Sequence, residues 1–236
     1  MDETKPHEAV LMAAAAGCVD VLGYLLLFHL FAAHMTGNTV KVSASFSQGD
    51  WRGAWHSLLP VPLFILGAML GSLVRDGAKR RRLPPRAVVL MVEVVLLAIF
   101  LAVGYPRIAT VTLRQGDALY YVLAALATLA MGMQNAVPTH YQNRSLGLTY
   151  VTGTLAHLGD GLAGWWGSPP GERRDRARRR ASVCGAVWLA YAGAAGVVGY
   201  LETLWGSLVV LIPIGCLTLI IGIDAYAAFV PPSGCS

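Results

Sequence analysis

Charged residues are scarce in this sequence: they make up 13% of its 236 residues, whereas apolar residues make up 56%. A soluble domain carries about 25% charged residues, so this composition excludes an ordinary soluble fold and indicates an integral membrane protein. The first residues, 1–8, lack the basic region and the small-residue cleavage site of a removable signal peptide. We therefore expect the first helix to stay in place as an anchor.

The sequence also lacks the residue patterns that build disulfide frameworks, metal sites and common active sites. The four cysteines are scattered, and the six histidines form no metal-binding helix motif. There is no Gly-x-Ser-x-Gly motif, no His-Glu-x-x-His motif and no closely spaced acid pair on one predicted face. The sequence therefore predicts no metal, no cofactor and no enzyme, although Asp20 with His34 or His140 stays open as the acid-base pair of an intramembrane enzyme.

Six largely apolar segments are each long enough to cross a hydrocarbon core of about 30 Å as an α-helix. They cover residues 9–32, 57–74, 87–105, 118–138, 182–201 and 206–229. A β-barrel would require short alternating strands instead. The predicted fold is all-α and integral to the membrane, with six transmembrane helices in a single membrane domain.

Two arginine clusters set the predicted orientation, because cytoplasmic loops carry an excess of Lys and Arg. One cluster follows the second segment, within 75–86, and the other precedes the fifth, within 173–180. The connections around Lys41 and Arg52 and over 106–117 are sparse in basic residues. We therefore expect both clusters and both termini in the cytoplasm. The clusters act as orientation signals that can contact anionic lipid, and nucleic-acid binding is not expected.

One pattern occurs twice: a small residue, a polar residue three positions later, and a Thr-Gly step further on. The copies are Gly17, Asp20 and 36–38, and Gly132, Asn135 and 152–154. Three predicted spans per copy place the copies in opposite orientations, which makes an inverted three-plus-three repeat. The predicted halves are residues 1–116 and 117–236. Chance similarity between two apolar, glycine-rich segments is the alternative.

Each Thr-Gly step is interpreted as a helix interruption, because threonine can cap a following helix and glycine permits unusual backbone angles. The apolar runs that follow, Thr39 to Phe46 and Leu155 to Gly167, are too short to span and suit half-helices or re-entrant segments. Non-helical backbone at membrane depth requires protein or a water-filled cavity around it. We therefore expect interrupted segments after helices 1 and 4, with ordinary surface turns as the alternative.

Acids inside the predicted helices are the strongest functional candidates, because a charge near the centre of a span is costly. Asp20 lies near the middle of the first segment, where it either takes up a proton or faces a polar cavity; a helix-locking hydrogen bond is the structural alternative. Glu93 lies seven residues beyond Arg86, about 10 Å into the third segment. Lining a cavity and reaching back to the interface are equal alternatives for Glu93. Asp224 is expected at the interface.

Glycines in the second and fifth segments favour close helix packing. They are Gly67 and Gly71, and Gly193, Gly196 and Gly199. Packing within one subunit explains them, and a homodimer contact is the alternative.

Four motifs, in this order, carry a resemblance to a known family: Ala16-Gly-Cys-Val-Asp20, Met35-Thr-Gly-Asn38, Gly132-Met-Gln-Asn135 and Tyr150-Val-Thr-Gly-Thr154. They closely resemble the YoaK family, bacterial membrane proteins grouped as a domain of unknown function (DUF1275). The resemblance covers nearly the whole chain. It implies six helices and a multi-pass location in the bacterial inner membrane, and it supplies no substrate.

The sequence is therefore predicted to encode a small-solute secondary transporter with alternating access to a central site between the repeats. Candidate residues for solute binding or coupling are Asp20, Thr36, Gly37, Asn38, Glu93, Gln134, Asn135, Thr152, Gly153 and Thr154. Asp20 and Asn135 are expected to face a shared cavity, with protonation of Asp20 as the coupling step. A passive channel, a membrane-embedded sensor or lipid-binding protein, and an intramembrane enzyme are the alternatives.

Overall fold

The computed structural model describes residues 5–108, 113–137, 140–141, 144–145 and 151–229. Within these ranges the chain is helical, apart from turns and two antiparallel strands of two residues each, β1 (His140–Tyr141) and β2 (Arg144–Ser145). The helices are α1 (Pro6–Leu26), α2 (Met35–Ser47), α3 (Trp51–Leu58), α4 (Pro60–Arg80), α5 (Pro85–Ile108), α6 (Ala118–Asn135), α7 (Val151–Gly167), α8 (Glu172–Trp205), the 3-10 helix η1 (Gly206–Val210) and α9 (Leu211–Phe229). The predicted all-α class is confirmed.

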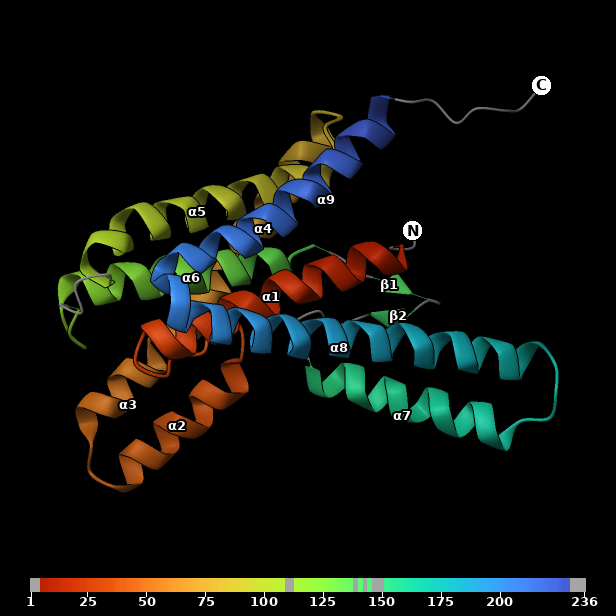
Figure 1. Ribbon diagram of the computed structural model, residues 1–236, viewed down its shortest axis with the longest axis horizontal. Helices are drawn as coiled ribbons and strands as arrows, with labels where there is room; N and C mark the ends of the chain where they lie inside the picture. Colours follow the sequence, from red (N-terminus) through yellow and green to blue (C-terminus); the bar gives the residue numbers. More distant parts are fainter. Residues whose placement is uncertain (1–4, 109–112, 138–139, 142–143, 146–150, 230–236) are drawn as a thin grey trace.

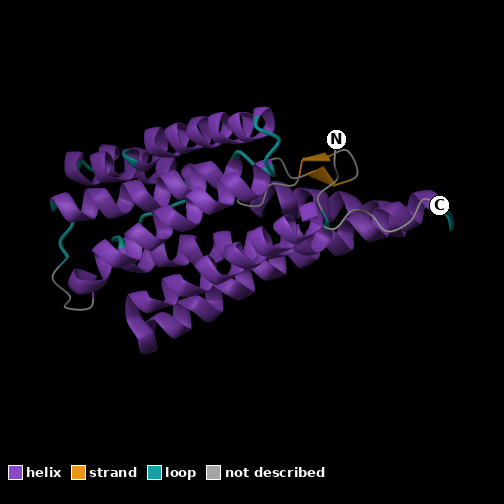
Figure 2. Ribbon diagram, turned by 90° about the horizontal axis from the view of Figure 1, so that it is seen from above, coloured by secondary structure: helices purple, strands orange, loops and turns teal. Residues whose placement is uncertain are grey.

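The helices α1, α4, α5, α6, α8 and α9 run along the length of the molecule (Figure 1), and the view from above shows long helices packed side by side (Figure 2). Four stretches of the described chain are long and apolar enough to cross a membrane: Pro6–Leu26, Trp51–Arg80, Pro85–Tyr105 and Glu172–Tyr226. The last stretch holds two long helices, α8 and α9, joined by η1. The chain is therefore a multi-pass membrane protein.

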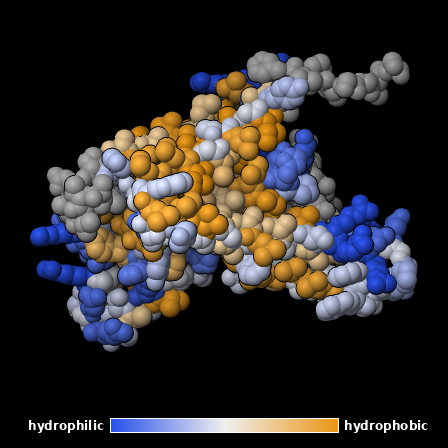
Figure 3. Space-filling model, viewed as in Figure 1, coloured by the Kyte–Doolittle hydropathy of each residue, from blue (hydrophilic) through white to orange (hydrophobic). Residues whose placement is uncertain are grey.

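The basic turns gather at one end of the bundle. In Figure 1 the start of α1, the α4–α5 turn, the α7–α8 turn and the end of α9 all lie towards the right. We call this the arginine-rich end, because residues 75–86 and 173–180 lie there. Figure 3 shows a mainly apolar middle between hydrophilic groups at the right and at the lower left, around α2 and α3. Such a distribution suits a bilayer, in which charged groups remain at the interfaces.

The buried core lies where α1, α5, α6 and α9 meet. Helix α1 packs along α8 and α9, and α6 packs along α4 and α5. Small side chains make this possible: Ala9, Ala13, Ala16 and Ala130 are fully buried. Backbones can approach closely where such residues face a neighbouring helix.

Two glycines of the repeated pattern lie where helices cross in close contact. A Cβ on Gly17 of α1 would overlap the carbonyl oxygen of Tyr191 in α8. A Cβ on Gly132 of α6 would overlap the carbonyl oxygen of Phe64 in α4. Both crossings therefore require glycine.

The predicted role of glycines in the second and fifth segments is correct for α4 and only partly correct for α8. A Cβ on Gly67 or Gly71 would lie less than 3.0 Å from atoms of α6. Gly193 and Gly196 of α8, by contrast, have nothing described within 4 Å of the position of a Cβ. Their side of α8 is therefore open to lipid or to a second copy of the chain. The prediction was only partly correct because the spacing of glycines along a helix does not show which face of that helix meets a neighbour.

The chain is interrupted after α1, as expected, but the break covers residues 27–34 and precedes the Thr36-Gly37 step to which the sequence interpretation assigned it. Helix α1 ends at Leu26 rather than at residue 32, because Phe28 and His29 have φ angles of 55° and 63°, a left-handed conformation that cannot continue a right-handed helix. Helix α2 then begins at Met35, so Thr36 lies inside its first turn. The expectation that Thr36 caps α2 is wrong. The corresponding connection between α6 and α7 falls largely outside the described residues.

Candidate functional site

Asp20 joins α1 to both the interruption and α8. Its carboxylate, 4% exposed, accepts hydrogen bonds from the backbone N–H of Ala33 at 2.7 Å and from the hydroxyl of Tyr191 at 2.6 Å. The Nδ1 atom of His34 lies 3.5 Å from the second carboxylate oxygen. The helix-locking hydrogen bond considered from the sequence is therefore present, and it is made to a residue of the other half of the chain.

His34 precedes α2, outside the spanning stretches, and can change its charge beside Asp20. The hydrogen-bonding interaction with the Asp20 carboxylate raises the pKa of His34, although partial burial acts in the opposite direction. A protonated imidazole at this position forms an ion pair with Asp20. The interruption thus contains a contact whose strength depends on pH.

Asn38 holds the same interruption from the other side. Its buried side chain donates from Nδ2 to the carbonyl oxygen of Phe31 at 2.7 Å and accepts from the Phe31 backbone N–H at 3.3 Å. Gly37 lets the Phe31 ring lie against the first turn of α2, since a Cβ there would be 3.1 Å from the ring. Thr36 is exposed. The Met-Thr-Gly-Asn motif therefore shapes the break in the chain through Gly37 and Asn38.

The residues of the second copy have different surroundings. Gln134 is buried and donates to the carbonyl oxygen of Met12 at 3.4 Å, and Asn135 donates to the carbonyl of Met131 in its own helix. On α7, Thr154 is buried, whereas Thr152 and Gly153 are exposed.

Asp20 and Asn135 are not brought together. The bond from Gln134 places the end of α6 level with Met12 of α1. Asp20 lies eight residues further along α1, about 12 Å at 1.5 Å per residue. The two polar residues of the repeat therefore lie at different depths along the bundle.

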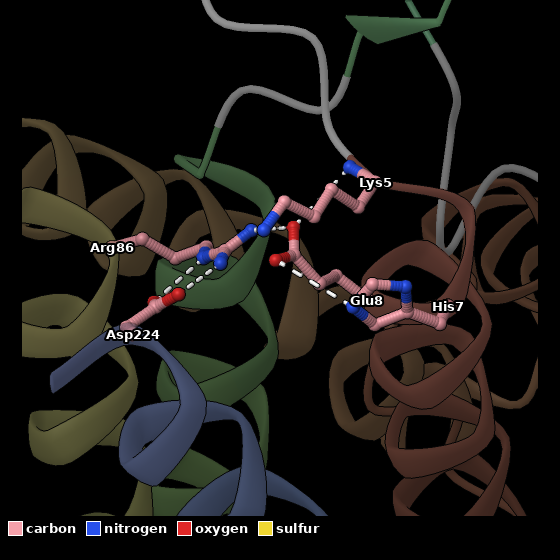
Figure 4. A network of polar contacts seen from close by, with 5 residues as sticks. All are labelled: Lys5, His7, Glu8, Arg86 and Asp224. Atoms are coloured by element: carbon pink, nitrogen blue, oxygen red, sulfur yellow. Dashed lines mark hydrogen bonds and ion pairs between the residues drawn. The ribbon is translucent and has the colours of Figure 1, made fainter. Parts of the chain in front are cut away.

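Arg86 ties three helices together at the arginine-rich end (Figure 4). Its Nε lies 2.7 Å from Oδ2 of Asp224 in α9, and its Nη2 contacts Oδ1 of the same carboxylate. Its Nη1 lies 2.5 Å from Oε2 of Glu8 in α1, which also accepts from the backbone N–H of Lys5. Bidentate arginine–carboxylate pairs are among the stronger hydrogen-bonded contacts. We call Glu8, Arg86 and Asp224 the arginine cluster.

The sequence interpretation missed this cluster, because it treated Arg86 as an orientation signal and Asp224 as an interfacial group. A usable signal was present. Glu8, Arg86 and Asp224 each lie near the end of an apolar segment that the predicted topology places on the same side. Opposite charges at adjacent helix ends on one side of a membrane favour pairing.

Aromatic residues gather at the opposite end of the bundle. The ring of Phe28, in the interruption, lies 5.8 Å from the ring of Tyr120 at the start of α6. His56 of α3 lies 5.5 Å from Tyr120 and 5.6 Å from Tyr121, measured between ring centroids. We call these four residues the aromatic cluster. It joins α3, α6 and the interruption.

Between the two clusters lie a buried acid and a small apolar cavity. Glu93 of α5 is 0% exposed, so it does not reach back to the interface, and within the described residues neither of its carboxylate oxygens has a hydrogen-bond partner. The cavity is lined by Val19, Leu22, Gly23, Leu97, Phe100, Ala127, Val210 and Pro213. These residues come from α1, α5, α6, η1 and α9, the elements that meet in the core.

Comparison with known proteins identifies relatives of the chain. It is 31% identical over 156 residues to UPF0700 transmembrane protein YoaK of Bacillus subtilis (strain 168), covering 65% of each chain. It is 31% identical over 150 residues to UPF0700 transmembrane protein RA0705 of Rhizobium meliloti (strain 1021), covering 64% of this chain and 58% of that protein. The chain thus spans less than two thirds of the length of either relative. No solved structure matches.

A family model described as "Protein of unknown function (DUF1275)" matches residues 9–223. This range includes Asp20, Asn38, Arg86 and Glu93. Since the match covers most of the chain, the protein belongs to the DUF1275 family.

Proposed function

We propose that this protein is a small-solute secondary transporter of the bacterial inner membrane. In this proposal six transmembrane helices form an inverted repeat of residues 1–116 and 117–236, with both termini in the cytoplasm. The arginine-rich end is then the cytoplasmic end, where the exposed arginines of 173–180 can contact anionic lipid. The solute reaches a central site between the halves from one side at a time.

The observation that carries the proposal is an exchange of helix contacts between the two halves. Gly17 of α1 lies on the backbone of α8, and Gly132 of α6 lies on the backbone of α4. The first helix of each half thus packs closely on the second long helix of the other half. Gly17 and Gly132 are also the aligned glycines of the repeated pattern. Halves related by a two-fold axis in the membrane plane would make such an exchange, and inverted repeats of this kind are typical of secondary transporters.

The clusters at the two ends supply the gates that alternating access requires. The arginine cluster joins α1, α5 and α9 on the arginine-rich side of the cavity. The aromatic cluster joins α3, α6 and the interruption on the other side. Opening either end means separating one cluster while the other stays closed.

Asp20 is the proposed coupling residue, because its carboxylate holds the two halves together. It accepts from Tyr191 of α8, in the second half, and from Ala33 of the interruption. Proton uptake by the carboxylate would weaken the bond to Tyr191 and the ion pair with His34, since hydrogen bonds to an ionised acceptor are the stronger ones. The contact of α1 with α8 would then loosen.

A membrane-embedded sensor or lipid-binding protein is the second candidate. The apolar lining of the small cavity favours it, because a polar solute would find few hydrogen-bonding groups there. Access to the cavity from the two sides of the membrane distinguishes these functions.

The test labels a cysteine placed in the cavity. In a variant without the four native cysteines, Ala127→Cys is treated with a membrane-impermeant maleimide in oriented vesicles, and Arg81→Cys reports the arginine-rich side alone. A transporter is labelled at position 127 from both sides. Adding Arg86→Gln raises labelling from the arginine-rich side and lowers labelling from the opposite side. The reason is that the conformation open at the arginine-rich end becomes more populated at the expense of the conformation open at the other end.

The other outcomes separate the alternatives. A passive channel would be labelled from both sides with no reciprocal change when Arg86→Gln is added. A sensor or lipid-binding protein would remain unlabelled at position 127 in both backgrounds, and that result would reject transport.

A further inference from the structure

The chain that leaves α1 turns back to the level of Asp20 before α2 begins. Asp20 lies six residues before the end of α1 at Leu26, about 9 Å at 1.5 Å per residue. The backbone N–H of Ala33 donates to the Asp20 carboxylate, so the chain has returned by that distance when it reaches Ala33. The start of α2 therefore lies at the depth of Asp20.

Helix α2 leads from this depth away from the arginine-rich end (Figure 1), towards the hydrophilic groups at the lower left of Figure 3. Exposed hydroxyl residues three or four positions apart form one face of α2: Thr36, Thr39, Ser43 and Ser47. Where these hydroxyls donate to the helix backbone, their oxygens still accept from water. Non-helical backbone at membrane depth also requires protein or a water-filled cavity around it. The interruption and this face of α2 therefore suit water that enters from the side opposite the arginine-rich end.

His34 joins the buried Asp20 carboxylate to solvent. Tyr191 of α8 donates to Oδ2 of Asp20 at 2.6 Å, and Nδ1 of His34 lies 3.5 Å from the same oxygen. The Asp20 side chain is 5% exposed, whereas the His34 side chain is 32% exposed. A proton can therefore enter at the open side of the imidazole ring and leave at the side that faces the carboxylate.

Histidine is also the better proton carrier of the two side chains that contact Asp20. Its ordinary pKa is about 6.5, whereas that of tyrosine is about 10. The hydrogen-bonding interaction with Asp20 raises the pKa of His34, so the ring holds a proton more readily. Tyr191, although partly exposed, donates its hydroxyl hydrogen to Asp20 and does not exchange protons readily near neutral pH.

Lys41 and His29 are the neighbouring titratable groups, and their contacts are with other parts of the interruption. The Phe31 ring lies 5.9 Å from the His34 ring, measured between centroids. Lys41 lies over the same Phe31 ring, 4.6 Å from its centroid, and donates to the carbonyl oxygen of His29. Within the described residues neither group forms an ion pair with Asp20. The titratable partner of the carboxylate near neutral pH is therefore His34.

We propose that His34 is the proton relay of Asp20, the group that passes protons to it from water on the side opposite the arginine-rich end. This inference rests on the proposed function, in which proton uptake by Asp20 is the coupling step. The ring takes a proton from water at Nε2 and becomes an imidazolium, whose charge draws it towards the carboxylate. Nδ1 then gives its proton to Oδ2 of Asp20, which leaves a neutral imidazole and a neutral carboxylic acid. Exchange with water returns the ring to its first tautomer.

The test measures how fast Asp20 takes up a proton. The purified protein is mixed rapidly from about pH 8 to about pH 4, a range that covers the ordinary pKa of histidine and reaches that of aspartate. Infrared spectroscopy follows the C=O absorption of carboxylic acids, and the part that is absent from Asp20→Asn belongs to Asp20. His34→Asn, which cannot carry a proton, should slow this part by about 100-fold, the lower end of what a positioned proton-transfer group contributes.

A matched control and a rescue separate proton transfer from a structural role. His29→Asn is the control, because His29 is exposed in the same interruption and its ring contacts Tyr24 rather than Asp20. Asparagine tolerates the left-handed backbone at this position, so His29→Asn should take up protons at the wild-type rate. Imidazole in the buffer should restore much of the rate in His34→Ala, because the space left by the ring admits a mobile proton carrier.

The side from which protons arrive is measured on the wild type and needs no variant. Oriented vesicles are acidified on one side only, and the Asp20 absorption is followed in the same way. Uptake should be fast when the side opposite the arginine-rich end is acidified and slow when the arginine-rich side is acidified. Fast uptake from the arginine-rich side would overturn the proposed path.

The remaining outcomes distinguish the relay from the proposed function. An unchanged rate in His34→Asn would overturn the relay and keep Asp20 as the coupling residue. A slow rate in His34→Ala that imidazole does not restore would also overturn the relay, because the loss would then be structural. No carboxylic acid at Asp20 in the wild type would reject both the coupling step and the relay, whereas labelling of position 127 from both sides would still support transport.

Discussion

Removal of the Arg86 side-chain charge tests the arginine cluster most directly. Arg86→Gln leaves the carboxylates of Glu8 and Asp224 without their cation, and their side chains are only 6% and 11% exposed. Breaking a buried ion pair at one partner costs about 3–5 kcal/mol. Because the Arg86 side chain is itself 22% exposed, we take the lower end, about 3 kcal/mol.

The measurement is thermal unfolding of the purified protein in detergent. For a chain of this length, about 1 kcal/mol corresponds to a shift of about 2–4 °C, so Arg86→Gln should lower the Tm by about 6–12 °C. Arg81→Gln is the control, because Arg81 is exposed in the turn that precedes α5. Surface changes of this kind stay within about 0.5 kcal/mol.

Neutralising Glu8 and Asp224 in addition distinguishes the loss of ion pairing from the loss of side-chain packing in Arg86→Gln. If Arg86→Gln destabilises by leaving two carboxylates unpaired, then adding Glu8→Gln and Asp224→Asn should recover much of the lost Tm, because the uncompensated charges are gone. The reasoning is wrong if the free energy of unfolding of Arg86→Gln differs from that of the wild type by less than about 1 kcal/mol. It is also wrong if the triple variant is no more stable than the single one.

Three other changes test the helix crossing and the interruption. Gly17→Ala forces a Cβ against a carbonyl oxygen of α8 and should destabilise the fold by about 1–3 kcal/mol. Gly193→Ala is the control, because the space around its new Cβ is open, and it should not destabilise the fold. Equal Tm values for the two variants would contradict the close crossing of α1 and α8. Asn38→Ala leaves the backbone N–H and C=O of Phe31 unpaired and should lower the free energy of unfolding, measured with a chemical denaturant, by about 2 kcal/mol. An unchanged free energy of unfolding would mean that water replaces both hydrogen bonds. His34 has a raised pKa, so its pairing with Asp20 stabilises the fold below about pH 6.5 and is lost as the pH rises through the higher folded pKa. The Tm advantage of wild type over His34→Asn should therefore shrink between pH 6 and pH 8, and a constant difference would refute the pairing.

The sequence by itself determined the membrane class and the approximate position of each long helix. These properties are local, because an apolar run of sufficient length partitions into a bilayer whatever it packs against. It also located the interruption near Met35-Thr-Gly-Asn38. It did not locate the end of α1 at Leu26, since hydropathy does not report the left-handed backbone of Phe28 and His29.

Only the tertiary structure decided which polar groups meet. Asp20 bonds to Tyr191, which is 171 positions away, and Arg86 bonds to Asp224 and Glu8, which are 138 and 78 positions away. The isolation of Glu93 likewise depends on what α1, α6 and α9 present to α5. A lone sequence shows that such groups are costly to bury, but the partner that offsets this cost, or its absence, is set by how distant helices pack together.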